Sequence, residues 1–358
     1  MAEIRALERA DLPAVASLLH TYLPGWPRGE GFVRYLAAAL LDHPWATDDM
    51  PSLVATQGGE VIGFIGSQVH RFRFDDRVLR GVCTSNIVVA ADHRGSAAGA
   101  LLLRRALSAG QELSWSDQAS TEVMRMWRAF GGRMDHVRAY DWMLVLRPAR
   151  WLGRVAATAI RQRSVGRETI PVGGIPIHVA GESFVRRAYR GSYPERSPEV
   201  TGEEASVARI VEHLPTLTRE ARFRADYDQE YLDHHFRQVE SLMGLLVRRL
   251  VLRRGDPIGW YAYLLRPRGT SRVLHIATTK ADAEAVVGEL VDHARSQGTA
   301  VLTGRIEPHL HWALRRRLAV LGFARQPTIH AQDPELDAVL STSSSLLTQL
   351  DGEWYVRP

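Results

Sequence analysis

The sequence predicts an α/β (α+β) fold of two similar domains, each a mixed, twisted sheet flanked by helices. Three observations lead to this prediction. The chain has 358 residues, of which 45% are hydrophobic, enough for a sizeable core in each of two domains. Both halves contain a hairpin, with turns at Gly58-Gly59 and Gly255-Asp256. The same order of strands and helices occurs in each half, although the amino acids themselves are not repeated.

Cap and turn residues set the ends of the elements in the first half. Asp11 can cap a helix, and Pro13 fits in its first turn because the N–H groups there have no intrahelical acceptor. Gly110 ends a helix rich in leucine and alanine. We expect strands at 4–6, 52–57, 61–69, 82–89, 112–116 and 136–146, and helices after Asp11 and at 31–41, 96–109 and 120–130. These elements form a first domain over residues 1–148.

A connecting segment, residues 149–202, follows the first domain. Its stretch 151–165 is amphipathic and basic, and we expect a helix packed across both domains; a membrane-surface helix is the alternative. Residues 203–358 form the second domain, and cleavage between 165 and 206 is expected to leave two separately compact fragments. Its predicted helices are 206–214, 281–296 and 309–321, and its predicted strands are 246–253, 258–265, 273–277, 300–305 and 328–331.

The composition argues against several functional classes. The formal net charge is +5, but the basic residues are mixed with carboxylates along the chain, which does not suit a nucleic-acid groove. Cys83 is the only cysteine, so a disulfide within the chain is excluded, and we expect Cys83 in the core. The sequence shows neither a secretory signal nor an apolar run of membrane-spanning length. We therefore expect a soluble, cytoplasmic protein.

The stretch from Ile87 to Leu102 is the most informative for function. It consists of a strand, a loop of basic and small residues from Arg94 to Gly99, and a helix. Small residues let the backbone approach a ligand closely, and successive N–H groups at a helix start can bind phosphate. Tight packing of the helix start against the sheet is the alternative. A dinucleotide-binding loop would need three glycines after the first strand, and a Walker loop would need Gly-Lys-Ser/Thr, so both are excluded.

This strand, loop and helix resemble motif A of the GNAT superfamily of acyltransferases. Arg94 and Gly99 fit that motif, while Ala97 stands where glycine is usual. The preceding hairpin, residues 54–66, also resembles the family. The segment 127–132 resembles the family's pattern of tyrosine, three residues and glycine, with tryptophan in place of tyrosine. The resemblance covers about residues 4–146, and a fainter one covers 206–331.

The resemblance implies an acyltransferase that uses acetyl-CoA or another acyl-CoA. From the residues themselves, we expect no metal. The pyrophosphate of CoA would bind the loop amides, the pantetheine arm would follow the strand, and N–H groups of that strand would hold the thioester carbonyl. The acyl group would pass directly to an amine or hydroxyl of a small-molecule acceptor, with a sugar among the candidates. The residues expected to bind the cofactor are Ile87, Val88, Val89, Arg94, Gly95, Ser96, Ala97, Ala98, Gly99 and Trp127.

Asp117 and Tyr140 are the candidate catalytic residues. Asp117 ends a strand beside the expected pantetheine groove, where a carboxylate could act as a base; capping the next helix is its alternative role. Trp127 is excluded as the proton donor to the leaving thiolate, because an indole N–H is not lost at physiological pH. Tyr140, Asp117 or a path of water molecules would have to serve instead.

Other segments suggest what the second half does not do. Its loop 278–283 lacks glycine and gains a carboxylate, so we expect no CoA site there. Asp233, His234 and His235 are expected at the surface and not at a metal, since adjacent histidines face different sides of a helix. The tail 347–355 resembles the ending of tandem GNAT proteins linked to envelope polysaccharide pathways, which favours a sugar acceptor.

Two other functional classes remain as alternatives. Fem-type aminoacyl-tRNA-dependent transferases also pair two GNAT domains, although the phosphate loop in the first half argues against this class. A non-catalytic CoA-binding scaffold is the third class, favoured by the tryptophan at the usual position of the acid.

Overall fold

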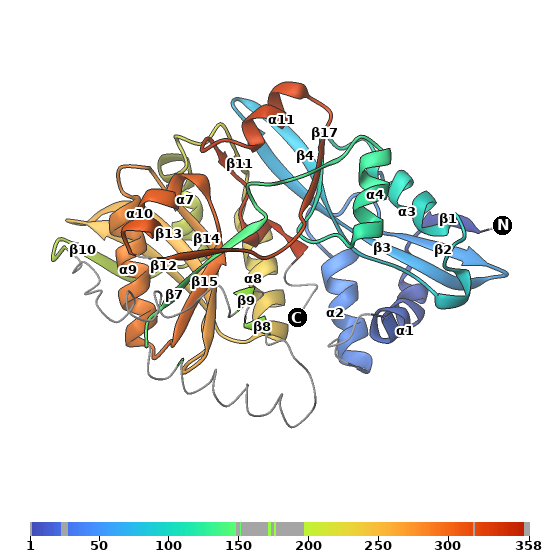
Figure 1. The fold of residues 1–358 in the computed structure, drawn as a ribbon, viewed down its shortest axis with the longest axis horizontal. Coiled ribbons are helices and arrows are strands. Elements are labelled where there is room, and N and C mark those ends of the chain that lie inside the picture. Colours follow the sequence, from blue (N-terminus) through green and yellow to red (C-terminus); the bar gives the residue numbers. More distant parts are fainter. Residues whose placement is uncertain are drawn as a thin grey trace.

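Two large mixed sheets form the framework of the molecule (Figure 1). The computed structural model describes residues 2–22, 28–147, 151, 171–172, 175–176, 197–317 and 319–353. The connecting helix expected at 151–165 lies outside the described residues, except for Trp151. Within the described residues, no helix combines the length and the apolar character that a membrane crossing requires.

The first sheet, sheet A, is built mainly from the first half of the chain. Its strands in spatial order are β1 (Glu3–Ala6), β2 (Leu53–Gln57), β3 (Glu60–Phe74), β4 (Arg77–Val89), β5 (Leu113–Ser116), β17 (Thr328–Ala331) and β6 (Arg133–Met134). Helices α1 (Leu12–Tyr22) and α2 (Glu30–Leu40) pack on one face with Val54 and Phe64. Helices α3 (Ala98–Leu107) and α4 (Thr121–Ala129) cover the other face, where Ala55 and Ile65 lie.

The second sheet, sheet B, repeats this arrangement. Its strands are, in order, β10 (Val200–Glu204), β12 (Leu246–Arg253), β13 (Asp256–Leu264), β14 (Thr270–Thr278), β15 (Val301–Arg305), β7 (Tyr140–Val145) and β16 (Val320–Phe323). Helices α7 (Val207–Leu217) and α8 (Gln229–Met243) pack on one face with Leu250 and Trp260, in the same hydrophobic core as α1 and α2. Helices α9 (Ala283–Ser296) and α10 (His311–Arg316) lie on the other face with Tyr261.

The two halves exchange strands. Strand β7 belongs to the first half of the chain but pairs with β15 and β16 in sheet B, while β17 of the second half pairs with β5 and β6 in sheet A. Figure 1 shows the green β7 among the orange strands and the red β17 beside the blue ones. This exchange argues against two separately compact fragments, because each sheet contains a strand from the other half. The boundaries at 148 and 203 stay a prediction.

Most other differences from expectation concern lengths and later elements. The hairpin of β3 and β4 is longer than expected and turns at Asp75, which has φ = 52°. The strand expected from 136 begins only at Tyr140, because Asp135 accepts hydrogen bonds from the backbone N–H groups of Val137 and Arg138 and holds them in a turn. Strand β11 (Phe223–Ala225), which pairs with the end of β3, and helix α11 (Pro334–Leu340) were not expected.

Candidate functional site

A cavity lies where β4 and β5 separate. The two strands pair in parallel from Gly81–Cys83 to Leu113–Trp115 and then diverge. The cavity has a volume of about 130 Å³. Its apolar wall consists of Ile65, Leu103, Val123 and Trp127, and its polar residues include Thr84, Ser85, Ser116, Gln118 and Glu353. A cavity of this kind, apolar with a few placed polar groups, is the usual form of a small-molecule site.

The strand beside the cavity carries a β-bulge. The pairing of β3 with β4 shifts between Phe64, which faces Val88, and Gly66, which faces Ser85. Asn86, inside the bulge, has φ = 53°, in the left-handed region. Gly66 makes room for the bulge, since a Cβ atom there would lie 2.5 Å from the hydroxyl oxygen of Ser85. Bulges interrupt the hydrogen-bond ladder and often lie next to active sites.

From this bulge, β4 leads through Ile87 to the loop before α3. The loop contains a short 3-10 turn, Ala91–His93, and then Gly95, which has φ = 88° and no atom within 4 Å of the place where a Cβ would be. The Ala98 N–H donates to the Ser96 hydroxyl (3.3 Å), and the first i to i−4 bond of α3 begins at the Leu101 N–H. The exposed guanidinium of Arg94 lies 4.7 Å above the Tyr22 ring. The positive end of α3 is therefore open toward solvent at this loop.

The carboxylate in the cavity comes from the other end of the chain. Oε1 of the buried Glu353 accepts hydrogen bonds from the Ser116 hydroxyl and the Gln118 N–H, both at 3.0 Å. The Glu353 N–H in turn donates to Oδ2 of Asp117 (3.1 Å). Sequence reasoning missed Glu353 as a site residue; the only signal was the family-like tail 347–355 in which it lies.

Asp117 is the partner of a buried arginine from the second half. The Arg305 guanidinium donates to Oδ1 of Asp117 (2.7 Å) and to the Leu347 carbonyl (2.6 Å). Both charged side chains are almost fully buried, at 1% and 5% exposure. Burial opposes the charge on Arg305, but the carboxylates of Asp117 and Glu307 raise its pKa above the ordinary value. Asp117 follows β5 and Arg305 ends β15, so this ion pair joins corresponding strands of the two halves.

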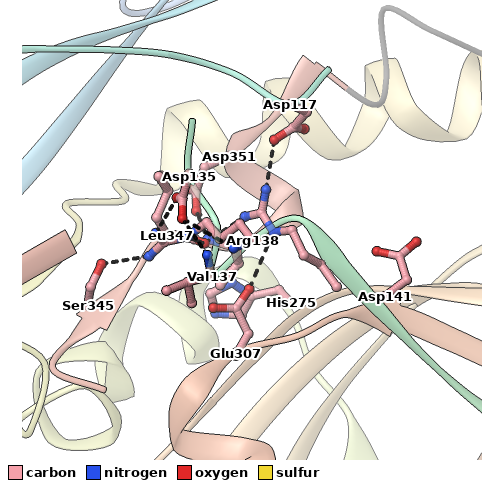
Figure 2. A network of polar contacts seen from close by, with 12 residues as sticks. Asp117, Asp135, Val137, Arg138, Asp141, His275, Glu307, Ser345, Leu347 and Asp351 are labelled. Carbon is pink, nitrogen blue, oxygen red and sulfur yellow. Dashed lines mark hydrogen bonds and ion pairs between the residues drawn. The ribbon is translucent and has the colours of Figure 1, made fainter. Parts of the chain in front are cut away.

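A second buried arginine holds the same C-terminal segment. Arg138 donates to the Leu347 carbonyl (3.0 Å), to the Ser345 hydroxyl (2.8 Å) and to Asp135 (2.7 Å). Although burial opposes it, the Arg138 guanidinium lowers the pKa of Asp135. Figure 2 shows Asp117, Asp135, Glu307 and Asp351 gathered around Arg138 and Leu347. The segment that supplies Glu353 is thus fixed by one arginine from each half.

Two carboxyl groups of this network are held toward their neutral form. Burial raises the pKa of Glu307 to about 7, against the opposing effect of Arg305. Burial also raises the pKa of Asp351, although its hydrogen bond with the Tyr227 hydroxyl acts in the opposite direction. Burial raises the pKa of the Cys83 thiol, which favours the neutral core residue expected from the sequence.

The predicted site residues separate into three places. Ile87 and Trp127 line the cavity, and the residues from Arg94 to Gly99 form the loop and first turn of α3. Asp117 lies beside the cavity but is bound to Arg305. Tyr140 lies on sheet B, is 43% exposed, and packs edge-on against Phe323. The structure does not bring Asp117 and Tyr140 together, and a catalytic role for either stays a prediction.

In the second half, the corresponding strands of sheet B also separate, but the cavity between them is almost closed. Strands β14 and β15 pair from Thr270–Val273 to Val301–Gly304 and then separate around a cavity of about 10 Å³. Before α9, the carboxylate of Asp282 contacts Arg253 (2.5 Å) and the Thr279 hydroxyl (2.8 Å). A carboxylate at a helix start repels phosphate, so the geometry does not favour CoA here.

The histidines of α8 are not at the surface. His235 is 1% exposed and stacks on Tyr231, and His234 is half-buried and bonds to the Ala38 carbonyl (3.0 Å). The expectation of surface positions is wrong because α8 packs between the halves and against α2. Among the described residues, no group of three or more histidine, cysteine, aspartate or glutamate side chains could hold a metal ion.

Solved structures share this fold over most of the chain. A GCN5-related N-acetyltransferase from Anabaena variabilis is 11% identical with a TM-score of 0.62, covering 93% of this chain and 73% of that one. A GCN5-related N-acetyltransferase from Kribbella flavida is 16% identical with a TM-score of 0.58, covering 93% and 71%. Saccharomyces cerevisiae N-myristoyltransferase with bound myristoyl-CoA is 10% identical with a TM-score of 0.53, covering 92% and 79%.

At these identities the similarity shows the fold alone. By sequence, the chain matches no protein-family profile and no curated protein. The predicted fold class is confirmed: two mixed, twisted sheets flanked by helices, in a GNAT-like arrangement.

Proposed function

We propose that this protein is an acyltransferase that takes an acyl group from acyl-CoA and passes it directly to an amine or hydroxyl of a small-molecule acceptor. The observation that carries the proposal is the cavity between β4 and β5, from which Ile87 to Val89 lead to an open helix start at α3. In this proposal, the phosphates of acyl-CoA bind at the start of α3, its pantetheine arm follows Ile87 to Val89, and its thioester lies in the cavity. The fold shared with N-acetyltransferases supports this reading.

The loop before α3 suits a pyrophosphate. The first N–H groups of a helix have no intrahelical acceptor and carry the positive end of its dipole. A Cβ at Gly95 would meet no atom within 4 Å, and one at Gly99 would meet only a Val89 methyl group at 3.5 Å. Gly95 therefore faces open space, which leaves room for a ligand against the backbone, while Gly99 packs beside Val89.

Glu353 is the group we assign to proton transfer. It is the carboxylate that lines the cavity, where an acceptor must lie to reach a thioester. In the proposed reaction, the acceptor nitrogen or oxygen bonds to the acyl carbon, the carbon–sulfur bond breaks, and Glu353 accepts the proton that the acceptor loses. The hydrogen bonds from Ser116 and Gln118 fix the carboxylate for this role.

Asp117 and Arg305 act in this proposal as positioning residues. Asp117 holds the backbone N–H of Glu353, and Arg305 holds both Asp117 and the Leu347 carbonyl. The second half of the chain thus contributes to the reaction by placing Glu353. It does not need a CoA site of its own to do so.

The cofactor assignment is tested by calorimetric titration with free CoA. Gly99→Glu places bulk and a negative charge against the pyrophosphate, so its affinity for CoA should fall below detection. The fold should survive, because glutamate is favourable in the first turn of a helix. Ala281→Glu, near the start of α9 in the second half, is the matched control and should keep wild-type affinity. Wild-type affinity in Gly99→Glu would remove the cofactor from this loop.

Thermal melting separates the alternative classes. A ligand that binds only the folded protein raises its melting temperature. Free CoA and acetyl-CoA should raise it, whereas bulk tRNA should not. Stabilisation by tRNA alone would favour an aminoacyl-tRNA-dependent transferase instead. A CoA-binding protein that releases no thiol from acetyl-CoA with a panel of amines and sugars would be a scaffold.

A further inference from the structure

The apolar wall of the cavity is closed by Trp127. This side chain is 1% exposed, although it lines the cavity together with Ile65, Leu103 and Val123. Ile65 and Leu103 are equally buried. We expect apolar groups that enter the cavity to lie against this wall, because there they displace water from an apolar surface. The other end is lined by hydroxyl groups and the Glu353 carboxylate, which suit the acceptor and the reacting atoms.

The cavity is small. Its volume of about 130 Å³ is close to the ~150 Å³ of an apolar cavity that takes up one benzene molecule, six heavy atoms. The thioester end of CoA and an acetyl or propionyl group are of this size. A chain of six or more carbons exceeds it, so such a chain requires the wall to move.

The wall is fixed from behind by the turn that ends α4. The Gly132 N–H donates to the Trp127 carbonyl (2.8 Å), and Gly131 has φ = 88°. A Cβ on Gly132 would lie 2.7 Å from Cε3 of the indole, so the ring packs directly against the backbone of this turn. Two adjacent glycines thus let the backbone close behind the ring. The indole has no space behind it into which it could move.

We propose that Trp127 limits the length of the acyl group, and that the co-substrate is the CoA thioester of a short acyl group, acetyl or propionyl. This inference rests on the proposed function, because it assigns the cavity to the acyl end of acyl-CoA. It gives the tryptophan of α4 a role in selectivity without a role in proton transfer.

The experiment is a calorimetric titration of the full chain with free CoA, acetyl-CoA, propionyl-CoA, butyryl-CoA and hexanoyl-CoA. Wild-type protein should bind acetyl-CoA and propionyl-CoA at least as tightly as free CoA, and hexanoyl-CoA at least tenfold more weakly. Trp127→Ala should reverse the order, with affinity rising up to about fourfold for each methylene group that enters the space vacated by the ring.

Two further variants make the result decisive. Val123→Ala shortens a half-buried side chain of the same wall and so enlarges the cavity. This variant should bind butyryl-CoA more tightly than wild type does, and it provides a test even if Trp127→Ala does not fold. Trp312→Ala removes a tryptophan that is 63% exposed on α10 and should leave the order unchanged. If wild type binds hexanoyl-CoA as tightly as acetyl-CoA, or if neither wall variant shifts the order, the inference fails while the proposed function stands. If free CoA itself does not bind, the proposed function fails.

Discussion

The carboxylates of Glu353 and Asp117 lie next to each other but have different partners. Glu353 accepts from a hydroxyl and a backbone N–H at the cavity, whereas Asp117 pairs with a buried guanidinium. Removing either partner of a buried ion pair leaves an uncompensated buried charge, which is strongly destabilising. In the proposed function, Asp117 therefore positions Glu353, and Glu353 takes the proton from the acceptor.

We therefore predict that Glu353→Gln lowers turnover by a factor of about 10² to 10⁴, the range typical of a lost general base. The amide oxygen of glutamine still accepts the bonds from Ser116 and Gln118, so the fold and the affinity for CoA should be retained. Thiol release from acetyl-CoA with a panel of amines and sugars measures turnover. Glu335→Gln, on the exposed surface of α11, is the control. Unchanged turnover in Glu353→Gln would assign the base to another group.

Helix α8 places the buried side chains of Tyr231, His235 and Phe236 between the halves. Its Tyr231 stacks on Trp45 with ring centres 3.7 Å apart, and the Tyr231 hydroxyl lies 3.3 Å from Nδ1 of His70. Burial lowers the pKa of His43 to about 3, with a smaller contribution from His234, and burial likewise lowers the pKa of His235 to about 3. Burial holds the pKa of His70 well below its ordinary value.

These shifts predict acid sensitivity. The unfolded chain protonates its histidines below about pH 6.5. The folded protein keeps His43 and His235 neutral until near pH 3, and burial also holds the pKa of His70 well below its ordinary value. The unfolded state then binds more protons, so the free energy of unfolding falls as the pH drops from about 6.5 toward 3. Protonation in the unfolded state should lower the free energy of unfolding by about 2 kcal/mol for His43 and by about 2 kcal/mol for His235 between pH 7.5 and pH 5.

Urea unfolding at pH 7.5 and pH 5.0 measures this effect. In wild type, Nδ1 of His43 accepts a hydrogen bond from the backbone N–H of Trp45. The side-chain oxygen of asparagine in His43→Asn can accept this bond instead, but the amide cannot be protonated in this pH range. The variant should lose about 2 kcal/mol less than wild type between the two pH values. His136→Asn, at an exposed histidine, should behave like wild type. An equal loss in His43→Asn would show that His43 does not contribute.

For the whole molecule, the exchange of β7 and β17 decides how the halves fold. A fragment without its partner would lack one strand of its sheet and would expose the edges that this strand covers. It would also leave Arg305 or Asp117 buried without its partner. The fold is therefore expected to be stable only when both halves are present.

Amide exchange of the fragments 1–165 and 166–358, the second of which keeps β10, tests this expectation. Each fragment alone should exchange most of its amide protons rapidly, because neither can complete its sheet. Mixing the two should restore slow exchange in β4, β5, β14 and β15. Slow exchange in either fragment alone, at the level of the intact chain, would show that its half folds independently.

The sequence by itself determined the elements whose signals are local. The hairpin turns, the end of α3 at Gly110 and the small-residue loop before α3 depend on backbone conformation and capping within a few residues, and these appeared close to their expected places. The repeated order of strands and helices predicted two similar sheets, because each strand and helix is indicated by residues within its own segment. The cavity could be expected between β4 and β5 only through the family resemblance.

The tertiary structure alone decided which strand completes each sheet and which carboxylate faces the cavity. A hydrogen-bond ladder does not depend on side-chain identity, so the residues of β7 and β17 cannot show which sheet they join. The contacts that place Glu353 join residues far apart: Ser116 and Glu353 are 237 positions apart, and Asp117 and Arg305 are 188 apart. Such pairs leave no periodic or local pattern, because they arise only when the two halves pack against each other.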